Sequence, residues 1–409
     1  MADVNFQLTE VKEGPVTFKI TDFGQNSQTS PKILSKKSMA VFYNPAQAFN
    51  RELSIILLHC WEQIEGNIAS LIEPLCGSGI RTLRYLLQGP EINTIVCNDI
   101  NPTAIDLTKM NIEFYNSLDS RRVIYYNMDA SRLLARMYSI GQWFDVVDID
   151  PYGSPQPFLR ESIRILRNPG LLLITATDMP VWVGLYRERA YKRYGIVNLR
   201  MNNRSYCHEI ALRALISYVQ REFLGFGYLV FPLLSISVDH YLRVAFKRSS
   251  GESKTILAQT GYIIECGTCF HRAAVPISQF SPEYLLCPCI RNWTTFAGPL
   301  WLGELHSQRM LESALKIYEN ASSEKYSSYK RLGRYFQALI AENGVKVPWF
   351  IDLHWLAKKV GIPLLPTSQI IDKLREGGYN ASSTHFTGRG IKTSLQVKEL
   401  AGLLQDKPK

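Results

Sequence analysis

The stretch Phe144-Asp145-Val146-Val147-Asp148-Ile149-Asp150-Pro151-Tyr152-Gly153-Ser154-Pro155 decides the predicted fold. Its apolar residues, interrupted by acids, indicate a buried parallel strand. The strand should stop at Pro151, because proline has no N–H to donate to a neighbouring strand. Asp150, Pro151 and Tyr152 would then lie at the carboxyl end of the strand, where open α/β sheets bind ligands. A strand followed by an ordinary Asp-Pro turn explains the same residues.

The three residues at this strand end suit a planar amine as ligand. The Tyr152 ring can stack on the plane of such a ligand. The Asp150 carboxylate and the Pro151 carbonyl can accept its N–H hydrogens. This stretch alone fits both an amine site and a plain turn, so features elsewhere in the chain are needed to distinguish them.

Length and composition limit the class of protein. The chain has 409 residues, of which 46% are apolar and 20% charged, and its net charge is +10. This length predicts two domains, and a change in composition after Gly251 divides them into residues 1–250 and 251–409. The sequence contains neither an apolar stretch that could span a bilayer nor a signal peptide, so we expect a soluble cytoplasmic protein. The positive charge favours a polyanionic partner, although it can also serve solubility, and no obligate protein partner is indicated.

Predicted strands and helices alternate from residue 68 onward. This alternation predicts an α/β fold with a doubly wound sheet and a smaller α+β domain at the C-terminus. The predicted strands are 68–75, 94–99, 123–126, 144–150 and 171–177, with a closing pair at 228–236 and 241–247, and the helices are 80–87, 102–115, 158–166 and 205–223.

A glycine turn after the first of these strands indicates a nucleotide-type cofactor. Gly77 and Gly79 let the backbone approach a ligand closely, and Asp99 follows Gly79 by 20 residues, the separation at which a carboxylate holds ribose hydroxyls. The third glycine of the dinucleotide fingerprint is missing, which disfavours a dehydrogenase. An adenosine with an amino-acid tail fits better, with Arg51 or Arg81 for its carboxylate.

Two further features strengthen this interpretation. Glu73 precedes the glycine turn, and Asp129-Ala130 follows the third strand, where it should also cap the next helix. Together with the turn and Asp99 they predict S-adenosylmethionine as the cofactor.

Several motifs, in this order along the chain, resemble the tRNA guanine-26 N2-dimethyltransferase family. The resemblance covers most of residues 40–301 and weakens beyond them. It rests on Phe42-Tyr43-Asn44-Pro45, Asn50-Arg51-Glu52-Leu53-Ser54, Glu73-Pro74-Leu75-Cys76-Gly77-Ser78-Gly79-Ile80-Arg81, Asp148–Pro155, Thr175–Asp178, Lys192–Gly195, His208-Glu209 and Gly298–Trp301.

The resemblance implies a class I methyltransferase domain that uses S-adenosylmethionine to place one or two methyl groups on N2 of a tRNA guanine. It implies that Asp150, Pro151 and Tyr152 hold the guanine, although the family often has phenylalanine at the position of Tyr152. The residues that it assigns to the cofactor are Phe42, Arg51, Arg81, Asp99, Asp129 and Ala130, in addition to the turn residues Glu73, Gly77 and Gly79.

A mechanism follows from these roles as a hypothesis. Asp150 accepts one N2 hydrogen, the Pro151 carbonyl orients the other, and the nitrogen attacks the sulfonium methyl in line. A guanine inside folded RNA must first be extruded from its stack. An adenine-N6 nucleic-acid methyltransferase and a non-catalytic nucleic-acid-binding module are the alternatives.

Four cysteines in the C-terminal part indicate a metal. Cys266 and Cys269 are separated by two residues, whereas Cys287 and Cys289 are separated by one, which departs from the usual spacing. Four thiolates would form a closed, structural zinc site. Reduced buried cysteines without a metal are the alternative.

Two segments are expected to contact tRNA. Residues 186–194 interleave basic and aromatic side chains, which suits phosphate contact and base stacking, although a solvated helix has the same pattern. The tail has predicted helices at 329–343, 352–360 and 367–376, and then a loop with His385, Arg389 and Lys392. This order resembles a winged helix that docks tRNA, or a helical cap. His208-Glu209 is expected to be structural.

Overall fold

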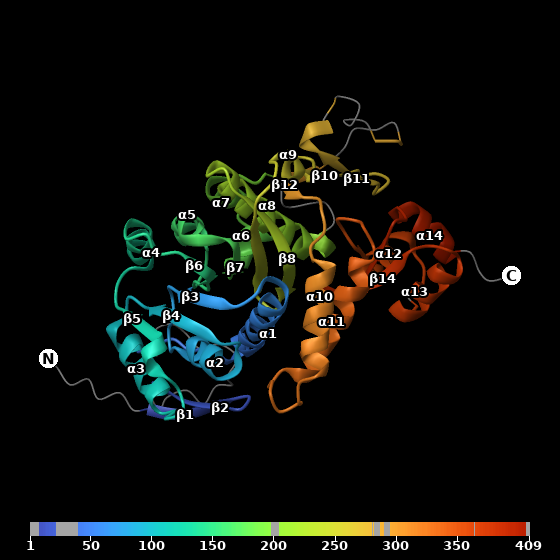
Figure 1. Ribbon diagram of the computed structural model, residues 1–409. Coiled ribbons are helices and arrows are strands. Elements are labelled where there is room, and N and C mark those ends of the chain that lie inside the picture. Colours follow the sequence, from blue (N-terminus) through green and yellow to red (C-terminus); the bar gives the residue numbers. More distant parts are fainter. Residues whose placement is uncertain are drawn as a thin grey trace. The chain divides into compact units, whose positions relative to one another are not determined.

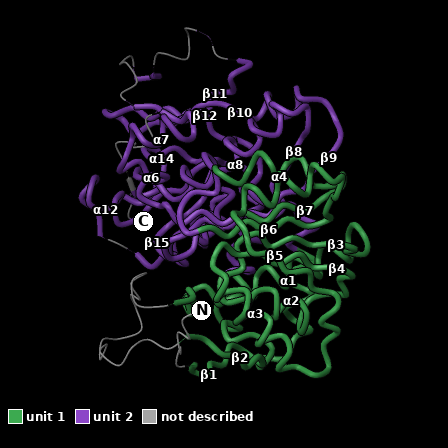
Figure 2. The backbone as a smooth tube through the Cα atoms, turned by 90° about the vertical axis from the view of Figure 1, so that its left-hand side faces the viewer, with its two compact units in different colours: residues 1–151, 157–174, 312–334 green, residues 152–156, 175–311, 335–409 purple. Residues whose placement is uncertain are grey.

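The structure is a computed structural model that describes residues 8–21, 40–197, 204–279, 281, 287–289, 295–363 and 365–405. The chain divides into two compact units, each made of several segments (Figure 2). The first unit contains residues 1–151, 157–174 and 312–334, and the second contains residues 152–156, 175–311 and 335–409. This border differs from the predicted one, and the division at residue 250 stays a prediction.

The largest sheet has seven strands in the order β5-β4-β3-β6-β7-β9-β8. Neighbouring strands from β5 to β7 run parallel, whereas β8 and β9 are antiparallel. The strands are β3 (Ile68–Glu73), β4 (Ile92–Asn98), β5 (Val123–Tyr126), β6 (Phe144–Ile149), β7 (Leu166–Ala176), β8 (Leu229–Val238) and β9 (Tyr241–Ser249).

Helices cover both faces of the parallel strands in the first unit. Helices α2 and α3 lie on one face, and α4 and α5 lie on the other (Figure 1). Strand β6 is consequently buried on both sides, and Val146, Val147 and Ile149 are fully buried. The helices of this unit are α1 (Ala48–Glu65), α2 (Ile80–Gln88), α3 (Pro102–Glu113), α4 (Ala130–Ser139) and α5 (Gln156–Ile165).

An antiparallel hairpin precedes the sheet. Strands β1 (Leu8–Glu13) and β2 (Val16–Thr21) pair with each other, and β2 packs against α2 and α3. Val16, Phe18 and Ile20 alternate with polar residues and join the hydrophobic core below these helices. The hairpin thus places its Glu13 beside α1 and α2.

The second unit contains the end of the large sheet and two smaller sheets, of order β11-β10-β12 and β13-β15-β14. Its strands are β10 (Thr260–Glu265), β11 (Arg272–Pro276), β12 (Thr295–Trp301), β13 (Ile351–Asp352), β14 (Ala381–Thr384) and β15 (Thr387–Thr393). Its helices are α6 (Met179–Trp182), α7 (Arg187–Tyr194), α8 (Cys207–Gly225), α9 (Lys254–Leu257), α12 (Leu353–Val360), α13 (Thr367–Glu376) and α14 (Val397–Gln405), while α10 (Gln308–Glu319) and α11 (Tyr329–Asn343) cross the border of the units.

The tail differs from the prediction at its basic loop. The three predicted helices are present as α11, α12 and α13, but the predicted loop after them is the hairpin β14–β15. Two of its three basic side chains, His385 and Lys392, are buried. The reason is pairing with buried carboxylates: Glu342 forms a hydrogen bond with His385, and Glu209 forms an ion pair with Lys392. The winged-helix assignment stays a prediction.

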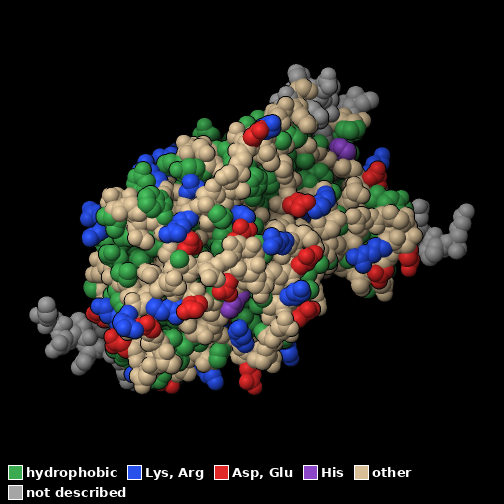
Figure 3. Space-filling view, viewed as in Figure 1, with side chains coloured by type: hydrophobic (Ala, Val, Ile, Leu, Met, Phe, Trp, Pro, Cys, Tyr) green, Lys and Arg blue, Asp and Glu red, His purple; other side chains and the backbone are tan. Residues whose placement is uncertain are grey.

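None of the described helices is long and apolar enough to cross a membrane. On the face that Figure 3 shows, Lys and Arg side chains are interspersed with Asp and Glu side chains. The net positive charge is therefore not gathered into one patch on that face.

Candidate active site

Asp150, in the first unit, follows β6 directly and is held by Arg81. The Arg81 guanidinium contacts the Asp150 carboxylate through Nη2 and lies 3.4 Å from Asp148 Oδ2 through Nη1. Asp148 also accepts a hydrogen bond of 2.5 Å from the hydroxyl of Tyr85. Asp150 is only partly buried, whereas Arg81 and Asp148 are buried. The buried guanidinium therefore fixes the orientation of a carboxylate that a ligand can reach.

The glycine turn lies between β3 and α2. Gly79 has a φ of +72°, and a Cβ there would lie 2.3 Å from the hydroxyl oxygen of Thr108, so the position requires glycine. The Gly77 N–H donates to Asp99 Oδ2 at 2.9 Å, and the Asn101 N–H donates to Asp99 Oδ1 at 2.9 Å. The structure thus brings the predicted turn and the predicted ribose carboxylate together.

Asn98 is a positioning residue that the sequence did not reveal. Its side-chain amide donates to the carbonyls of Pro74 and Met128 at 2.9 and 3.0 Å, and its oxygen accepts from the Met128 N–H at 3.1 Å. One fully buried side chain therefore ties the ends of β3, β4 and β5 together. Its only signal in the sequence is its place directly before Asp99.

Two apolar side chains are exposed beside this turn. Phe42 is half-exposed, and its carbonyl oxygen is the nearest atom to a Cβ built on Gly77, at 3.3 Å. Ile100 follows Asp99 and is 69% exposed, while the Asn127 amide holds its carbonyl at 3.1 Å. Ile100 was absent from the predicted site. Exposed apolar groups beside a glycine turn suit a flat, partly apolar ligand such as an adenine.

Arg51 is buried on α1 and paired with the N-terminal hairpin. Its Nε donates to Glu13 Oε1 at 2.8 Å, and its Nη2 contacts Glu13 Oε2 and the Asn44 carbonyl, the latter at 3.1 Å. Among the described residues, none accepts a hydrogen bond from Arg51 Nη1. Arg51 therefore keeps donor capacity for a ligand, whereas Arg81 is engaged by Asp148, Asp150, Asn50 and Ser54.

Glu73, at the end of β3, is buried and faces the protein interior. Its carboxylate contacts the Thr82 hydroxyl and lies 3.7 Å from Arg81 Nε. Burial raises the pKa of Glu73 to about 8, in spite of these two neighbours. Its predicted contact with the cofactor stays a prediction.

Asp129 and Ala130 lie at the start of α4. Asp129 is the N-cap, and its side chain accepts a hydrogen bond of 3.0 Å from the Arg132 N–H. Asp129 remains partly exposed and Ala130 is buried. The expected cap is present, and the role of both residues toward the cofactor stays a prediction.

In the second unit, the loop that begins at Tyr152 is fastened by hydrogen bonds. Gly153 N–H donates to the Thr177 hydroxyl at 2.6 Å, and Thr177 N–H donates to the Gly153 carbonyl at 2.9 Å. The Tyr194 hydroxyl lies 2.6 Å from both Ser154 Oγ and Asp178 Oδ2. The Tyr152 side chain is 71% exposed, so most of it is in contact with solvent.

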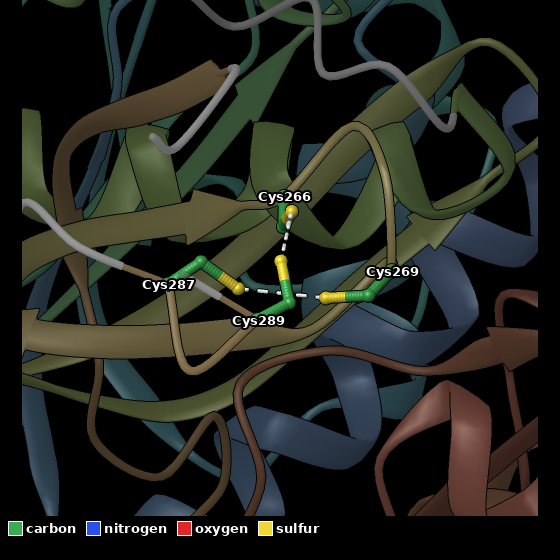
Figure 4. A group of neighbouring side chains, drawn as sticks. All are labelled: Cys266, Cys269, Cys287 and Cys289. Carbon is green, nitrogen blue, oxygen red and sulfur yellow. Dashed lines mark hydrogen bonds between the residues drawn. The ribbon is translucent and has the colours of Figure 1, made fainter. Parts of the chain in front are cut away.

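The four predicted cysteine ligands converge in the second unit (Figure 4). Their sulfur atoms all lie within 4.8 Å of one another, with 3.7 Å between Cys266 and Cys289 and 3.4 Å between Cys269 and Cys287. These distances are too long for disulfides, and they are close to the separation of about 3.8 Å that Zn–S bonds of about 2.3 Å impose in a tetrahedron. The short gap between Cys287 and Cys289 thus does not prevent convergence, and the donor set fits zinc.

A second group of ligand-type side chains, His306, Glu342 and His385, is structural. Glu342 Oε1 lies 3.2 Å from His306 Nε2 and 2.6 Å from His385 Nδ1. The other nitrogen of each ring accepts a backbone N–H, from Ser235 and Ser237, at 3.2 Å. A neutral histidine with one nitrogen as acceptor must carry its proton on the nitrogen that faces Glu342. That nitrogen is then a donor and has no lone pair for a metal.

Comparison with known proteins identifies the family. A model of the N2,N2-dimethylguanosine tRNA methyltransferase family matches residues 17–405. The chain belongs to this family.

Curated relatives match over nearly the whole length. The tRNA (guanine(26)-N(2))-dimethyltransferase of Methanothermobacter thermautotrophicus is 31% identical, over 98% of this chain and 100% of that protein. The enzyme of the same name from Pyrobaculum islandicum is 32% identical, over 96% and 98%. The tRNA (guanine(26)-N(2)/guanine(27)-N(2))-dimethyltransferase of Aquifex aeolicus is 30% identical, over 92% of each chain.

A solved structure of the family has the same fold. Trm1 from Pyrococcus horikoshii, in complex with S-adenosyl-L-methionine, superposes with a TM-score of 0.81 and 26% identity, over 98% of this chain and 100% of that one. The predictions of the family, of the class I methyltransferase fold and of the enzyme class are thereby confirmed. None of these comparisons tests the roles of individual residues or the predicted zinc ion.

Proposed function

We propose that this chain methylates the exocyclic N2 of guanine 26 in tRNA, adding one or two methyl groups from S-adenosylmethionine. The observation that carries this proposal is the Asp150-Pro151-Tyr152 stretch at the end of β6, in a member of the dimethylguanosine family. The name of the Aquifex relative makes guanine 27 a second candidate target. A cytoplasmic location, as expected from the sequence, is part of the proposal.

The first unit supplies residues that fit the cofactor. The glycine turn and Asp99 would hold the adenosine, with Phe42 and Ile100 against the base, and Arg51 would bind the amino-acid carboxylate. Arg51 is preferred to Arg81 because Arg51 Nη1 has neither a hydrogen bond nor an ion pair with a described residue, whereas each guanidinium nitrogen of Arg81 is paired with a carboxylate. Glu73, Asp129 and Ala130 would complete the surroundings. The bound cofactor would supply an electrophilic methyl group.

Asp150, Pro151 and Tyr152 would position the guanine. The guanine amine is a poor nucleophile because its lone pair is delocalised into the ring. Asp150, oriented by Arg81, accepts one N2 hydrogen and takes up the proton that is released when the nitrogen is methylated. The Pro151 carbonyl accepts the other hydrogen, and the Tyr152 ring stacks on the base, so that the nitrogen is held ready for attack.

Methylation of purified tRNA and of duplex DNA, side by side with labelled S-adenosylmethionine, tests the proposal against its rivals. The proposal expects label in tRNA alone. Label in DNA adenine would favour an adenine-N6 methyltransferase. A protein that binds tRNA but does not bind S-adenosylmethionine would be a non-catalytic binding module.

Zinc would occupy the cysteine cluster with a structural role, because four thiolates leave no position for water. The supporting observation is the convergence of the four sulfur atoms. We expect one zinc per chain in freshly purified protein by metal analysis, with less in Cys289→Ser and an unchanged content in Cys207→Ser, which lies outside the cluster. Wild-type protein without zinc would refute the assignment.

A further inference from the structure

The N-terminal hairpin contributes a buried acid, Glu13, to the surroundings of the proposed cofactor site. Both carboxylate oxygens of Glu13 bind Arg51, at 2.8 Å to Nε and by a second contact to Nη2. The Tyr43 hydroxyl donates to Oε2 at 3.0 Å, and Arg84 Nη1 donates to Oε1 at 2.7 Å. The acid therefore lies among two cations and a hydroxyl, all of them buried.

This arrangement fixes one guanidinium in a single orientation. A carboxylate that binds Nε and one Nη of an arginine holds the whole planar group, because the two bonds run side by side. In Arg51 these are Nε and Nη2, and Nη2 also binds the Asn44 carbonyl at 3.1 Å. Arg51 Nη1 has no acceptor among the described residues. Because the guanidinium is planar, fixing its Nε and Nη2 also fixes the direction in which Nη1 points.

Arg51 also lies beside the segment that touches the glycine turn. Asn44, which it binds, is two residues from Phe42, and the Phe42 carbonyl is the atom nearest to a Cβ built on Gly77. Tyr43, between them, is held by the same Glu13. Glu13 thus binds both Tyr43 and Arg51, although it is not part of the glycine turn.

We propose that Glu13 is a positioning residue for the cofactor, which orients Arg51 so that Nη1 binds the carboxylate of S-adenosylmethionine. The inference rests on the proposed function, because it takes Arg51 as the ligand of the amino-acid end. Glu13 touches neither the methyl donor nor the guanine. Its effect should be confined to ligands that carry the amino-acid tail.

The test compares two ligands on the full-length protein by isothermal titration calorimetry. S-adenosylmethionine has the carboxylate, whereas 5′-methylthioadenosine keeps the adenosine and the sulfur but lacks the amino-acid tail. In Glu13→Gln we expect the Kd for S-adenosylmethionine to rise by about tenfold, because a charge-assisted hydrogen bond is lost. The Kd for methylthioadenosine should stay within about twofold of the wild-type value.

Glu13→Asp is a second variant that tests the inference even if Glu13→Gln does not fold. It keeps the negative charge between Arg51 and Arg84, but its shorter side chain cannot reach both nitrogens of Arg51 while Arg84 holds it, so the same selective loss is expected. Glu10→Gln is the matched control, since Glu10 is exposed on the same strand and pairs in register with Lys19. It should bind both ligands as wild type does.

Two results would overturn the inference alone. Wild-type affinity for S-adenosylmethionine in both Glu13 variants would mean that Arg51 needs no support from the hairpin. Equal losses for the two ligands would mean that Glu13 only stabilises the fold. Wild-type protein that fails to bind S-adenosylmethionine would contradict the proposed function itself, together with the inference that rests on it.

Discussion

At the scale of single residues, the candidate site and its surroundings contain ion pairs between carboxylates and buried guanidinium groups. Arg81 is bound by Asp148 and Asp150, and Glu13 is bound by Arg51 and Arg84. A buried ion that lost its partner would cost several kcal/mol, so each group has at least one opposite charge. The three carboxylates differ in exposure: Glu13 and Asp148 are buried, whereas Asp150 is partly exposed and can also reach a ligand.

Asp150→Asn should abolish most of the methylation and leave cofactor binding intact. The amide cannot take up the proton released from the guanine nitrogen, and we expect kcat to fall by about 100-fold or more. Arg81 still has Asp148, which lies 3.4 Å away, so the fold should persist. Single-turnover rates with tRNA and the Kd for S-adenosylmethionine separate the two effects. Methylation at the wild-type rate would show that Asp150 has no chemical role.

Glu13 should make stability depend on acid pH. Burial opposes its ionisation, but Arg51 and Arg84 outweigh burial and lower the pKa of Glu13 from 4.5 to about 2. The folded state therefore holds fewer protons than the unfolded chain between these values. The stability from this ionisation is complete above pH 4.5 and is lost as the pH falls through 2, a change of about 3 kcal/mol.

Urea unfolding of wild type and Glu13→Gln at several pH values measures this contribution. The difference in their free energies of unfolding should be constant above pH 5 and shrink toward pH 2. A difference that does not change over this range would contradict the ionised, paired state of Glu13.

At the scale of elements, the sequence predicted local features well and long-range partners poorly. The strand that precedes Asp150, the glycine turn and the strand that precedes Asp99 are local patterns, and the structure contains all three. Glu13 could not be foreseen as a partner of Arg51, because 38 residues separate them. Lys392 was expected to face tRNA but is buried, because Glu209 binds it from 183 residues away. Whether a charged side chain is buried therefore cannot be predicted from the sequence until its partner in the fold is known.

Helix α7 has the side chains expected of an element that contacts RNA. It buries Ala190 and Tyr194 and exposes its basic side chains together with Tyr191. Arg189 also lies 5.1 Å from the centre of the Tyr186 ring. Cations interleaved with exposed rings suit both phosphates and unstacked bases.

Arg189→Glu should weaken tRNA binding and reduce its salt dependence. We expect the slope of log Kd against log salt concentration to fall by about 1 for the lost phosphate contact. Arg121→Glu, the same change at a side chain that is 89% exposed in the other unit, is the control. Equal affinities of the two variants for tRNA would exclude α7 from the RNA-binding surface.

At the scale of the whole molecule, the chain returns to its first unit late in the sequence. Residues 312–334 belong to that unit, although they follow the cysteine cluster. The buried Glu52 on α1 accepts hydrogen bonds from the N–H and hydroxyl of Ser327, both at 2.7 Å, and from the Ser328 N–H at 3.0 Å. The methyltransferase part is thus completed by a distant segment.

A fragment of residues 1–250 should therefore be less stable than the full-length protein. Without Ser327 and Ser328, the carboxylate of Glu52 keeps Arg84 at 3.5 Å and loses its neutral donors. We expect a lower free energy of unfolding, by about 1 to 3 kcal/mol for each buried acceptor left unsatisfied. Equal urea midpoints for the fragment and the full chain would refute this dependence.

The most direct test of the central claim is mass spectrometry of nucleosides from tRNA transcripts incubated with the protein and labelled S-adenosylmethionine. Two transcripts are compared, one with guanine and one with adenine at position 26, both without guanine at position 27. We predict labelled N2-methylguanosine or N2,N2-dimethylguanosine in the first transcript and no label in the second. An unlabelled first transcript, or label on another base, would contradict the proposed function.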